Sequence, residues 1–214
     1  MAERWTRERR VQHTRNVLLD AAEELFARKG FGGASLEDIA DAAGYTRGAI
    51  YSQFGSKEEL FLAVIEQHRE RFLEGFADVI SSFHRFSDLN LDELAVRWRD
   101  LSRADAEQAA TLEYELTLFL LRNPQARKRV AAQRRETVRW LSDYITSSLA
   151  RLGATLHMPA TDLARVILAT NDGVTLNSHV DDEDLYRPFL QLIVANIGPS
   201  ADGSQSGPRK PRAR

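Results

Sequence analysis

Apolar residues recur at helical spacing along almost the whole chain, and this periodicity limits the possible folds more than any other feature. Between Val17 and Phe26, valine, leucine, alanine and phenylalanine side chains return every three or four residues and so share one helical face. Glycine or proline ends several of these runs. No segment shows the alternation typical of a β-strand. The sequence therefore predicts an all-α protein of about nine helices.

Start and stop signals divide the periodic region into successive helices. Ser35 and Ser56 each stand three positions before an acidic residue, which is the pattern of a capped helix N-terminus. Gly30, Gly44 and Gly153 stand where helices are expected to end. The acidic residues 181–184 are predicted to form a turn and the first turn of the last helix. After the first helix, the expected helices cover about residues 36–43, 46–54, 57–82, 91–102, 105–122, 125–152, 160–180 and 184–197.

The two ends of the chain are basic, whereas its body is acidic. The formal net charge is −2, residues 1–15 and 198–214 carry +3 each, and −8 is left for the residues between them. Such ends indicate local contact with a polyanion, although solvated tails without a function give the same pattern. Residues 198–214 are rich in Gly, Ser, Pro and basic residues, and we expect a disordered basic tail there.

The sequence lacks the patterns of several other classes of protein. The absence of cysteine excludes disulfides, Cys–zinc sites and thiol catalysis. Charged residues interrupt every apolar stretch well before the ~20 residues of a membrane span. The 5 histidines have no metal-ligand spacing, and no glycine-rich phosphate loop is present. We expect a cytoplasmic protein that is not an enzyme, has no membrane association, and has no catalytic residue, metal or cofactor.

Two short helices joined by a tight turn occupy residues 36–54. A close crossing of two helices needs a small residue, which Ala40 supplies, and the turn needs a residue that tolerates positive φ, which Gly44 supplies. Ile39 and Ile50 are expected to fill the crossing. This spacing is typical of a DNA-binding helix-turn-helix. A helical corner without a role in DNA binding has the same pattern.

The second helix of this pair carries the candidate DNA contacts. No acidic residue occurs from residue 44 to residue 57. Arg47 can donate two hydrogen bonds to O6 and N7 of guanine. Gly48 and Ala49 leave room for a close approach of the backbone to the major groove. The candidates for contact with flanking phosphates are Thr46, Tyr51 and Lys57.

Four sequence segments carry a further signal. They are AAEELF at residues 21–26, KGF at 29–31, SLEDIA at 35–40 and TRGAIYSQFGSKEELF at 46–61. Together they resemble the signature of TetR-type transcriptional regulators. The specific match covers about residues 12–65, and beyond it the resemblance is one of length and helical layout. Gln53 departs from the histidine common at its place in the family, but its amide can still donate to a phosphate.

The resemblance implies a homodimer in which each chain has an N-terminal DNA-binding domain and a C-terminal ligand-binding domain. In this chain the domains correspond to residues 1–56, with a basic arm at 1–10, and to residues 57–197. By position, Arg47, Gly48 and Ala49 face base edges, and Phe54 lies in the core behind the recognition helix. The residues implied to hold phosphates are Ser35, Thr46, Tyr51, Gln53 and Lys57. Arg7, Arg9 and Arg10 would lie in the basic arm beside the DNA.

The resemblance also implies dimerisation through the last two helices, residues 160–180 and 184–197, as a four-helix interface across a two-fold axis. Alternatively, their apolar faces only complete the core of one chain. The apolar residues concerned are Leu163, Val166, Ile167, Leu168, Val174 and Leu176 on the first helix, and Phe189, Leu190, Leu192, Ile193 and Val194 on the second.

The resemblance further implies a small-molecule pocket inside the helical bundle of the C-terminal domain. Either Glu113 or Glu115 can face such a cavity, because the two flank Tyr114. Asn171 interrupts an apolar helix, and a buried amide needs a partner, which a ligand, a water molecule or a second subunit can supply. The aromatic candidates can instead belong to the core. The candidate ligand-binding residues are Trp98, Glu113, Tyr114, Trp140, Tyr144 and Asn171, and Phe119 lies on the same middle helices.

These observations predict a ligand-responsive, sequence-specific DNA-binding regulator. We expect a repressor that a small lipophilic or aromatic effector releases from double-stranded DNA with an inverted repeat. The long helix at 57–82 is the expected lever between the two domains. The alternative is a DNA-binding regulator or architectural protein without a small-molecule ligand.

Overall fold

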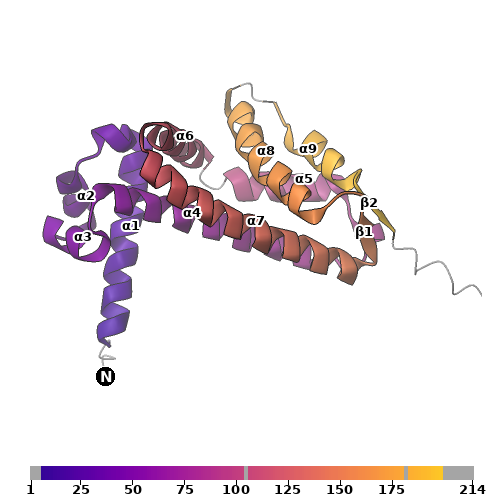
Figure 1. Ribbon diagram of the computed structural model, residues 1–214, viewed down its shortest axis with the longest axis horizontal. Helices are drawn as coiled ribbons and strands as arrows, with labels where there is room; N and C mark the ends of the chain where they lie inside the picture. Colours follow the sequence, from indigo (N-terminus) through magenta and orange to yellow (C-terminus); the bar gives the residue numbers. More distant parts are fainter. Residues whose placement is uncertain (1–5, 104–105, 181–182, 200–214) are drawn as a thin grey trace, which may run out of the picture. The chain divides into compact units, whose positions relative to one another are not determined.

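The computed structural model describes residues 6–103, 106–180 and 183–199. Nine α-helices are present in this part of the chain (Figure 1), which confirms the all-α expectation. A short 3₁₀ helix, Phe86–Asp88, follows the fourth of them. The helices are α1 Arg7–Gly33, α2 Leu36–Ala43, α3 Arg47–Phe54, α4 Lys57–Ser81, α5 Leu91–Arg103, α6 Ala106–Arg122, α7 Pro124–Leu152, α8 Ala160–Val180 and α9 Tyr186–Val194.

The chain forms two compact units. Unit 1 consists of Met1–Gly75 and Ser102–Arg127, and unit 2 of Phe76–Leu101 and Lys128–Arg214. The boundaries fall inside α4 and α7, so each of these helices contributes residues to both units. Unit 1 contains α6 in addition to α1, α2 and α3. This grouping joins α6 to the helices of the N-terminal region, although the sequence places α6 far beyond residue 56.

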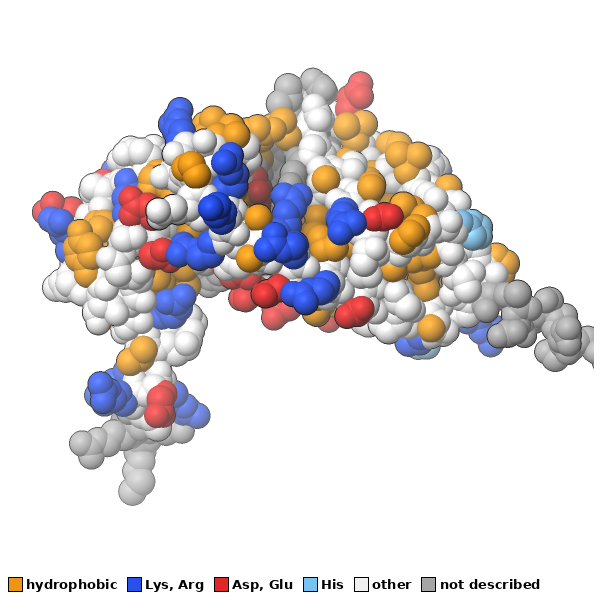
Figure 2. All heavy atoms as spheres, in the orientation of Figure 1, with side chains coloured by type: hydrophobic (Ala, Val, Ile, Leu, Met, Phe, Trp, Pro, Cys, Tyr) orange, Lys and Arg blue, Asp and Glu red, His pale blue; other side chains and the backbone are white. Residues whose placement is uncertain are grey.

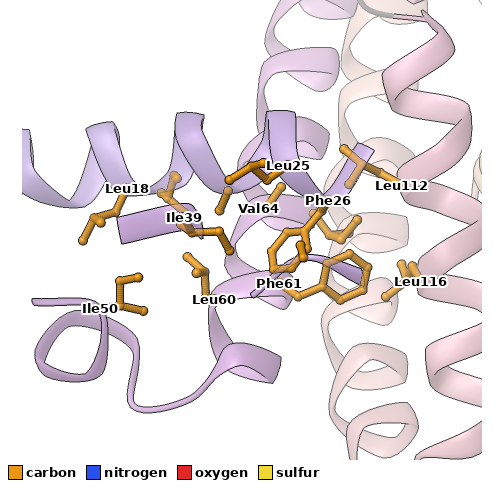
Figure 3. Close-up of a cluster of buried hydrophobic side chains, with 14 of the residues drawn as sticks. Leu18, Leu25, Phe26, Ile39, Ile50, Leu60, Phe61, Val64, Leu112 and Leu116 are labelled. Atoms are coloured by element: carbon orange, nitrogen blue, oxygen red, sulfur yellow. The ribbon is translucent and has the colours of Figure 1, made fainter. Parts of the chain in front are cut away.

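One contiguous hydrophobic core holds unit 1 together. Its buried side chains come from α1, α2, α3, α4 and α6, and Figure 3 shows them meeting between these helices. Phe61 lies at its centre, with ring centroids 5.1 Å from Phe26, 5.0 Å from Phe31 and 5.8 Å from Phe119. Aromatic pairs at these distances contribute roughly 0.5–1.5 kcal/mol each beyond the burial of their surface.

The first helix is interrupted by a kink at Gly30. This residue has φ 71° and ψ 166°, values outside the range of an α-helix. Helical geometry resumes for one short turn after it. The Glu115 carboxylate of α6 accepts a hydrogen bond of 3.0 Å from the backbone N–H of Phe31, next to the kink. A Cβ atom at Gly30 would lie 2.8 Å from Oε1 of Glu115. The expected helix end at Gly30 is therefore a kink that α6 stabilises.

A buried carboxylate links α1 to α4 within unit 1. Glu23 accepts a hydrogen bond from Arg71, and its other oxygen lies 3.4 Å from Nδ1 of His68. Burial raises the pKa of Glu23, but the hydrogen bonds with His68 and Arg71 and the positive charge of Arg71 outweigh this effect. The net result is a pKa below the ordinary value.

Two short strands correct the expectation that no β-structure occurs. Strand β1, Ala154–Leu156, pairs antiparallel with β2, Ile197–Pro199, and Thr155 stands opposite Gly198. Three-residue strands are too short to produce a recognisable alternation of apolar and polar residues. Gly198 and Pro199, expected in the disordered tail, therefore belong to the sheet, whereas residues 200–214 lie outside the described part of the chain.

Three boundaries, at the start of α1 and at both ends of α9, differ from the predicted ones by more than one residue. Arg7, Arg9 and Arg10, expected in an arm, form the first turn of α1, and the Thr6 hydroxyl caps that turn by accepting from the backbone N–H of Arg9. The last helix covers only Tyr186–Val194. Asp184 lies before this helix and accepts from the backbone N–H of Tyr186. Residues 181 and 182 of the predicted acidic turn lie outside the described residues. Among the described helices, none is long and apolar enough to cross a membrane.

Candidate nucleic-acid interface

Helix α2 and the turn after it have the local geometry that the sequence predicts. The Ser35 hydroxyl accepts from the backbone N–H of Asp38, and the Asp38 carboxylate accepts in return from that of Ser35, which completes a capping box. Gly44 ends the helix in the left-handed conformation, with φ 68° and ψ 29°. Ala40 and Ile39 are buried at the crossing, so the predicted helix-turn-helix is present.

Helix α3 begins at a second capped terminus. The Thr46 hydroxyl accepts from the backbone N–H of Ala49 at 3.3 Å. Ile50 is the one fully buried residue of this eight-residue helix. Arg47, Gly48 and Tyr51 are exposed on its other faces, whereas Ala49 is half-buried. The helix is therefore anchored by one side chain, and two of the three predicted base-facing residues, Arg47 and Gly48, are exposed.

The remaining predicted phosphate contacts differ in their exposure. Ser35 and Thr46 are exposed, and Gln53 is half-buried. The Lys57 ammonium lies 4.7 Å above the ring of Phe31, at the N-terminus of α4. Its partial burial lowers the pKa of Lys57 below the ordinary value, and nearby Glu58 offsets part of this effect. The ring of Phe31 therefore limits the positions that the Lys57 ammonium can take.

Positive charge continues beyond α3. The first turn of α1 carries three exposed arginines and one glutamate. Figure 2 shows these basic side chains gathered on the N-terminal end of α1. The Lys29 ammonium, in contrast, lies 2.9 Å from the Asp38 carboxylate and is paired. Exposed basic side chains therefore lie on α3, at Arg47, and on the first turn of α1.

Three residues near the ends of α3 were not predicted from the sequence: Thr14 and Arg15 on α1, and Tyr45 in the turn before α3. The Thr14 hydroxyl lies 3.2 Å from that of Tyr45, and the Arg15 guanidinium lies 4.6 Å from the centre of the Phe54 ring. The sequence offered no signal for these pairs, because their members lie 31 or more positions apart. In the sequence, Arg15 is one of five arginines in the basic segment 1–15 and belongs to no motif.

The structure does not bring all the predicted ligand-binding residues together. In unit 2, the indole N–H of buried Trp98 donates to Oδ1 of Asn171 at 3.0 Å. Phe76 lies between the rings of Trp98 and Tyr144, at 4.9 Å and 6.1 Å. Trp140 stacks on Tyr144 at 5.4 Å and is 42% exposed. Four of the six candidates therefore share one aromatic cluster of unit 2.

The other two candidates lie in unit 1, on α6. Tyr114 is 46% exposed, and Glu113 is half-buried. Their neighbour Glu115, which was considered for the same cavity, instead binds the backbone of Phe31. Phe119 packs in the core of unit 1. The apolar surroundings of these residues on α6 are thus those of the unit 1 core.

The apolar faces of α8 and α9 are divided between the interior and the surface. Val166 is 50% exposed and Leu192 is 70% exposed. Five of the eleven predicted apolar residues are buried within unit 2, and the alternative of a completed core describes this group. The buried ones are Leu163, Ile167, Val174, Phe189 and Leu190.

Comparisons with known proteins agree with this geometry. Residues 18–64 match the family model described as bacterial regulatory proteins, tetR family. The HTH-type transcriptional regulator UidR of Escherichia coli strain K12 is 28% identical over 194 residues, which cover 88% of this chain and 93% of UidR. The HTH-type transcriptional activator FasR of Mycolicibacterium smegmatis is 41% identical over 61 residues, 28% of each chain.

Solved structures share the fold. The crystal structure of a putative TetR-family transcriptional regulator from Rhodococcus sp. superposes with a TM-score of 0.69. The match covers 86% of this chain and 98% of that one, at 19% sequence identity. The helical layout is therefore common to this chain and that structure over most of their length, whereas the higher identity, to FasR, extends over 61 residues only.

Proposed function

We propose that this chain, which belongs to the TetR family of bacterial transcriptional regulators, is a ligand-responsive repressor that acts in the cytoplasm. Family membership makes it a helix-turn-helix DNA-binding regulator and not an enzyme. The single observation that carries the sequence-specific part is the exposed face of α3. It presents Arg47, Gly48 and Tyr51 on a helix with capped ends and no acidic residue.

Two such helices are needed to read an inverted repeat. A dimer places its recognition helices in major grooves about one turn of DNA apart. Arg47 then reads a guanine edge, while Ser35, Thr46, Tyr51, Gln53 and Lys57 hold phosphates on either side. The exposed Val166 and Leu192 support a dimer interface on α8 and α9, since large apolar side chains at the surface are typical of such contacts.

The aromatic cluster of unit 2 supports the ligand-responsive part. Trp98, Tyr144 and Asn171 combine large apolar surfaces with a small number of polar groups, which is typical of small-molecule sites. A lipophilic or aromatic ligand that enters this cluster must separate some of these side chains from one another. It would then favour one conformation of the dimer over another, and a few kcal/mol of differential affinity is enough to release DNA.

The test uses fluorescence anisotropy with the duplex upstream of the protein's own gene, in the presence of non-specific competitor. We expect saturable binding by two chains per site or a multiple of two. Arg47→Ala should cost about 1–3 kcal/mol of specific binding and relax the preference for the guanine position. Arg28→Ala is the matched control, because Arg28 is exposed and paired with Glu24.

Two results would contradict this function. Unchanged affinity and unchanged ranking of operator variants in Arg47→Ala would remove the base contact. To test for a ligand, a panel of aromatic and fatty-acyl compounds is added to the protein–duplex complex, and the anisotropy of the duplex is measured. Release of the bound duplex by members of the panel supports the proposal, and binding that the whole panel leaves unaltered favours the ligand-independent alternative.

A further inference from the structure

One turn of α1 contacts both ends of the recognition helix. Tyr45 immediately precedes the N-cap residue of α3, and its hydroxyl lies 3.2 Å from that of Thr14. Phe54 is the last residue of α3, and its ring lies beneath the guanidinium of Arg15 at 4.6 Å. Thr14 and Arg15 are neighbours in the sequence. The position of α3 is therefore tied to α1 at its beginning and at its end.

Such bracing matters because α3 has little stability of its own. An isolated helix of this length is marginal in water, and Ile50 is its one fully buried residue. A single anchor in the middle leaves the helix free to tilt about it. Contacts at both ends restrict this tilt, so the two α1 residues position the base-facing side chains.

The Arg15 guanidinium also differs from that of several other arginines in its surroundings. Some other arginines of unit 1 are paired with carboxylates, as Arg28 is with Glu24 and Arg71 is with Glu23. Within the described residues, Arg15 has no carboxylate partner, and the face of Phe54 holds its guanidinium. A guanidinium stacked on a ring keeps the donors at its edge free for a planar, doubly bonded anion.

We propose that Arg15 binds a DNA phosphate at the edge of the α3 footprint, with Phe54 and the Thr14–Tyr45 contact fixing its position. This inference rests on the proposed function, because it assigns a further contact to the same interface. A phosphate oxygen pair accepts two parallel N–H bonds from the guanidinium, and the duplex supplies that chemistry next to each groove that α3 enters. The partner is thus the operator backbone, and the contact carries no base preference.

The experiment compares Arg15→Gln, Arg15→Lys and Arg28→Gln in the full-length protein. Dissociation constants are measured with the operator duplex and with a non-specific duplex over a range of salt concentrations. Arg15→Gln should weaken binding to both duplexes by a similar factor of about tenfold. Each phosphate that is no longer neutralised should lower the slope of log affinity against log salt by about 0.9. Arg28→Gln should leave affinity and slope unchanged.

The lysine variant separates charge from geometry. Arg15→Lys keeps the charge and therefore the salt slope, but it should lose affinity because an ammonium cannot make the planar double contact. Phe54→Leu removes the ring under Arg15 and should also weaken binding with the slope retained. If Arg15→Gln does not fold, as judged by circular dichroism, Arg15→Lys and Phe54→Leu test the proposal instead. Both must then weaken DNA binding without altering the salt slope.

The outcomes distinguish this inference from the function it rests on. If the wild-type protein does not discriminate between operator and competitor, the proposed function fails, and the slope on the non-specific duplex still tests Arg15. If the wild type discriminates and Arg15→Gln behaves like Arg28→Gln, only the role of Arg15 is refuted. Loss of operator ranking in Arg15→Gln with an unaltered salt slope would also refute it, because Arg15 would then only brace α3 and would not neutralise a phosphate.

Discussion

Units 1 and 2 are held together in different ways. Unit 1 has one contiguous core of aliphatic and aromatic side chains, and local capping residues define the ends of its short helices. Hydrogen bonds between distant segments occur in both units, but several of those in unit 2 join the end of α4 to α7, next to the aromatic cluster of Phe76, Tyr144 and Trp140. Arg151 donates to the backbone carbonyl oxygens of Phe83 and Ile80 at the end of α4, and Tyr144 donates to that of Ala77.

This difference corresponds to the roles that we propose for the units. A surface that reads DNA must keep its geometry, and a dense apolar core resists deformation. A region that accepts a ligand must exchange some interactions for others, and hydrogen bonds such as that of Trp98 with Asn171 can be exchanged. Four predictions test this comparison, in order of decreasing effect.

The core of unit 1 should be the most sensitive region. Phe61→Ala removes a ring that has no exposed surface and contacts three other phenylalanines, and it should lower the free energy of unfolding by about 3–5 kcal/mol. Denaturation in urea, followed by circular dichroism, measures the loss. Trp140→Ala, which truncates a side chain 42% exposed, is the control in unit 2 and should cost clearly less. Equal losses would contradict the comparison.

The kink of α1 should be the next most sensitive point. Gly30→Ala forces an alanine into positive φ and displaces Glu115 from the N–H of Phe31, so we expect a cost of about 2–3 kcal/mol. Gly44→Ala has the same sign of φ but meets no atom within 4 Å, and it should cost about 1–2 kcal/mol. In a Glu115→Ala background the two costs should become equal. A persistent difference would show that Glu115 is not its cause.

A hydrogen bond of unit 2 supplies the third prediction. Asn171→Ala removes the Oδ1 atom that accepts from the indole N–H of buried Trp98, and it should cost about 1–2 kcal/mol. The tryptophan emission should shift at the same time, because the environment of the indole changes. Asn177→Ala is the control, since Asn177 lies on the same helix, is exposed and donates to its own helix backbone at Gly173. Identical spectra for the two variants would argue against the Trp98 contact.

The smallest effect is a dependence of stability on pH. The pKa of Glu23 is lowered in the folded protein, so its stabilising contribution is present above the unfolded pKa and disappears as the pH falls through the folded one. One such group changes stability by at most about 1.4 kcal/mol per pH unit. Glu23→Gln should make the unfolding free energy of unit 1 less dependent on pH in the acidic range. An unaltered profile would exclude a role of this carboxylate.

The helix-turn-helix could be predicted from the sequence because its determinants are local. The capping box at Ser35, the N-cap at Thr46 and the left-handed turn at Gly44 each involve residues only a few positions apart. The crossing of α2 and α3 needs a small side chain, which Ala40 supplies. The short sheet could not be predicted, because three-residue strands carry no period. The division of the chain into units was equally hidden, since α6 and α1 meet only in the folded state.

The sequence by itself determined the helical class, the ends of most helices and the residues exposed on α3, since capping, turn conformation and periodicity are properties of neighbouring residues. The tertiary structure alone decided which distant partner a given side chain meets. Glu115 rather than Glu113 binds Phe31 across 84 positions, and Asn171 binds Trp98 across 73. Such pairings depend on how whole helices pack, and no local pattern encodes the distance between two residues that far apart.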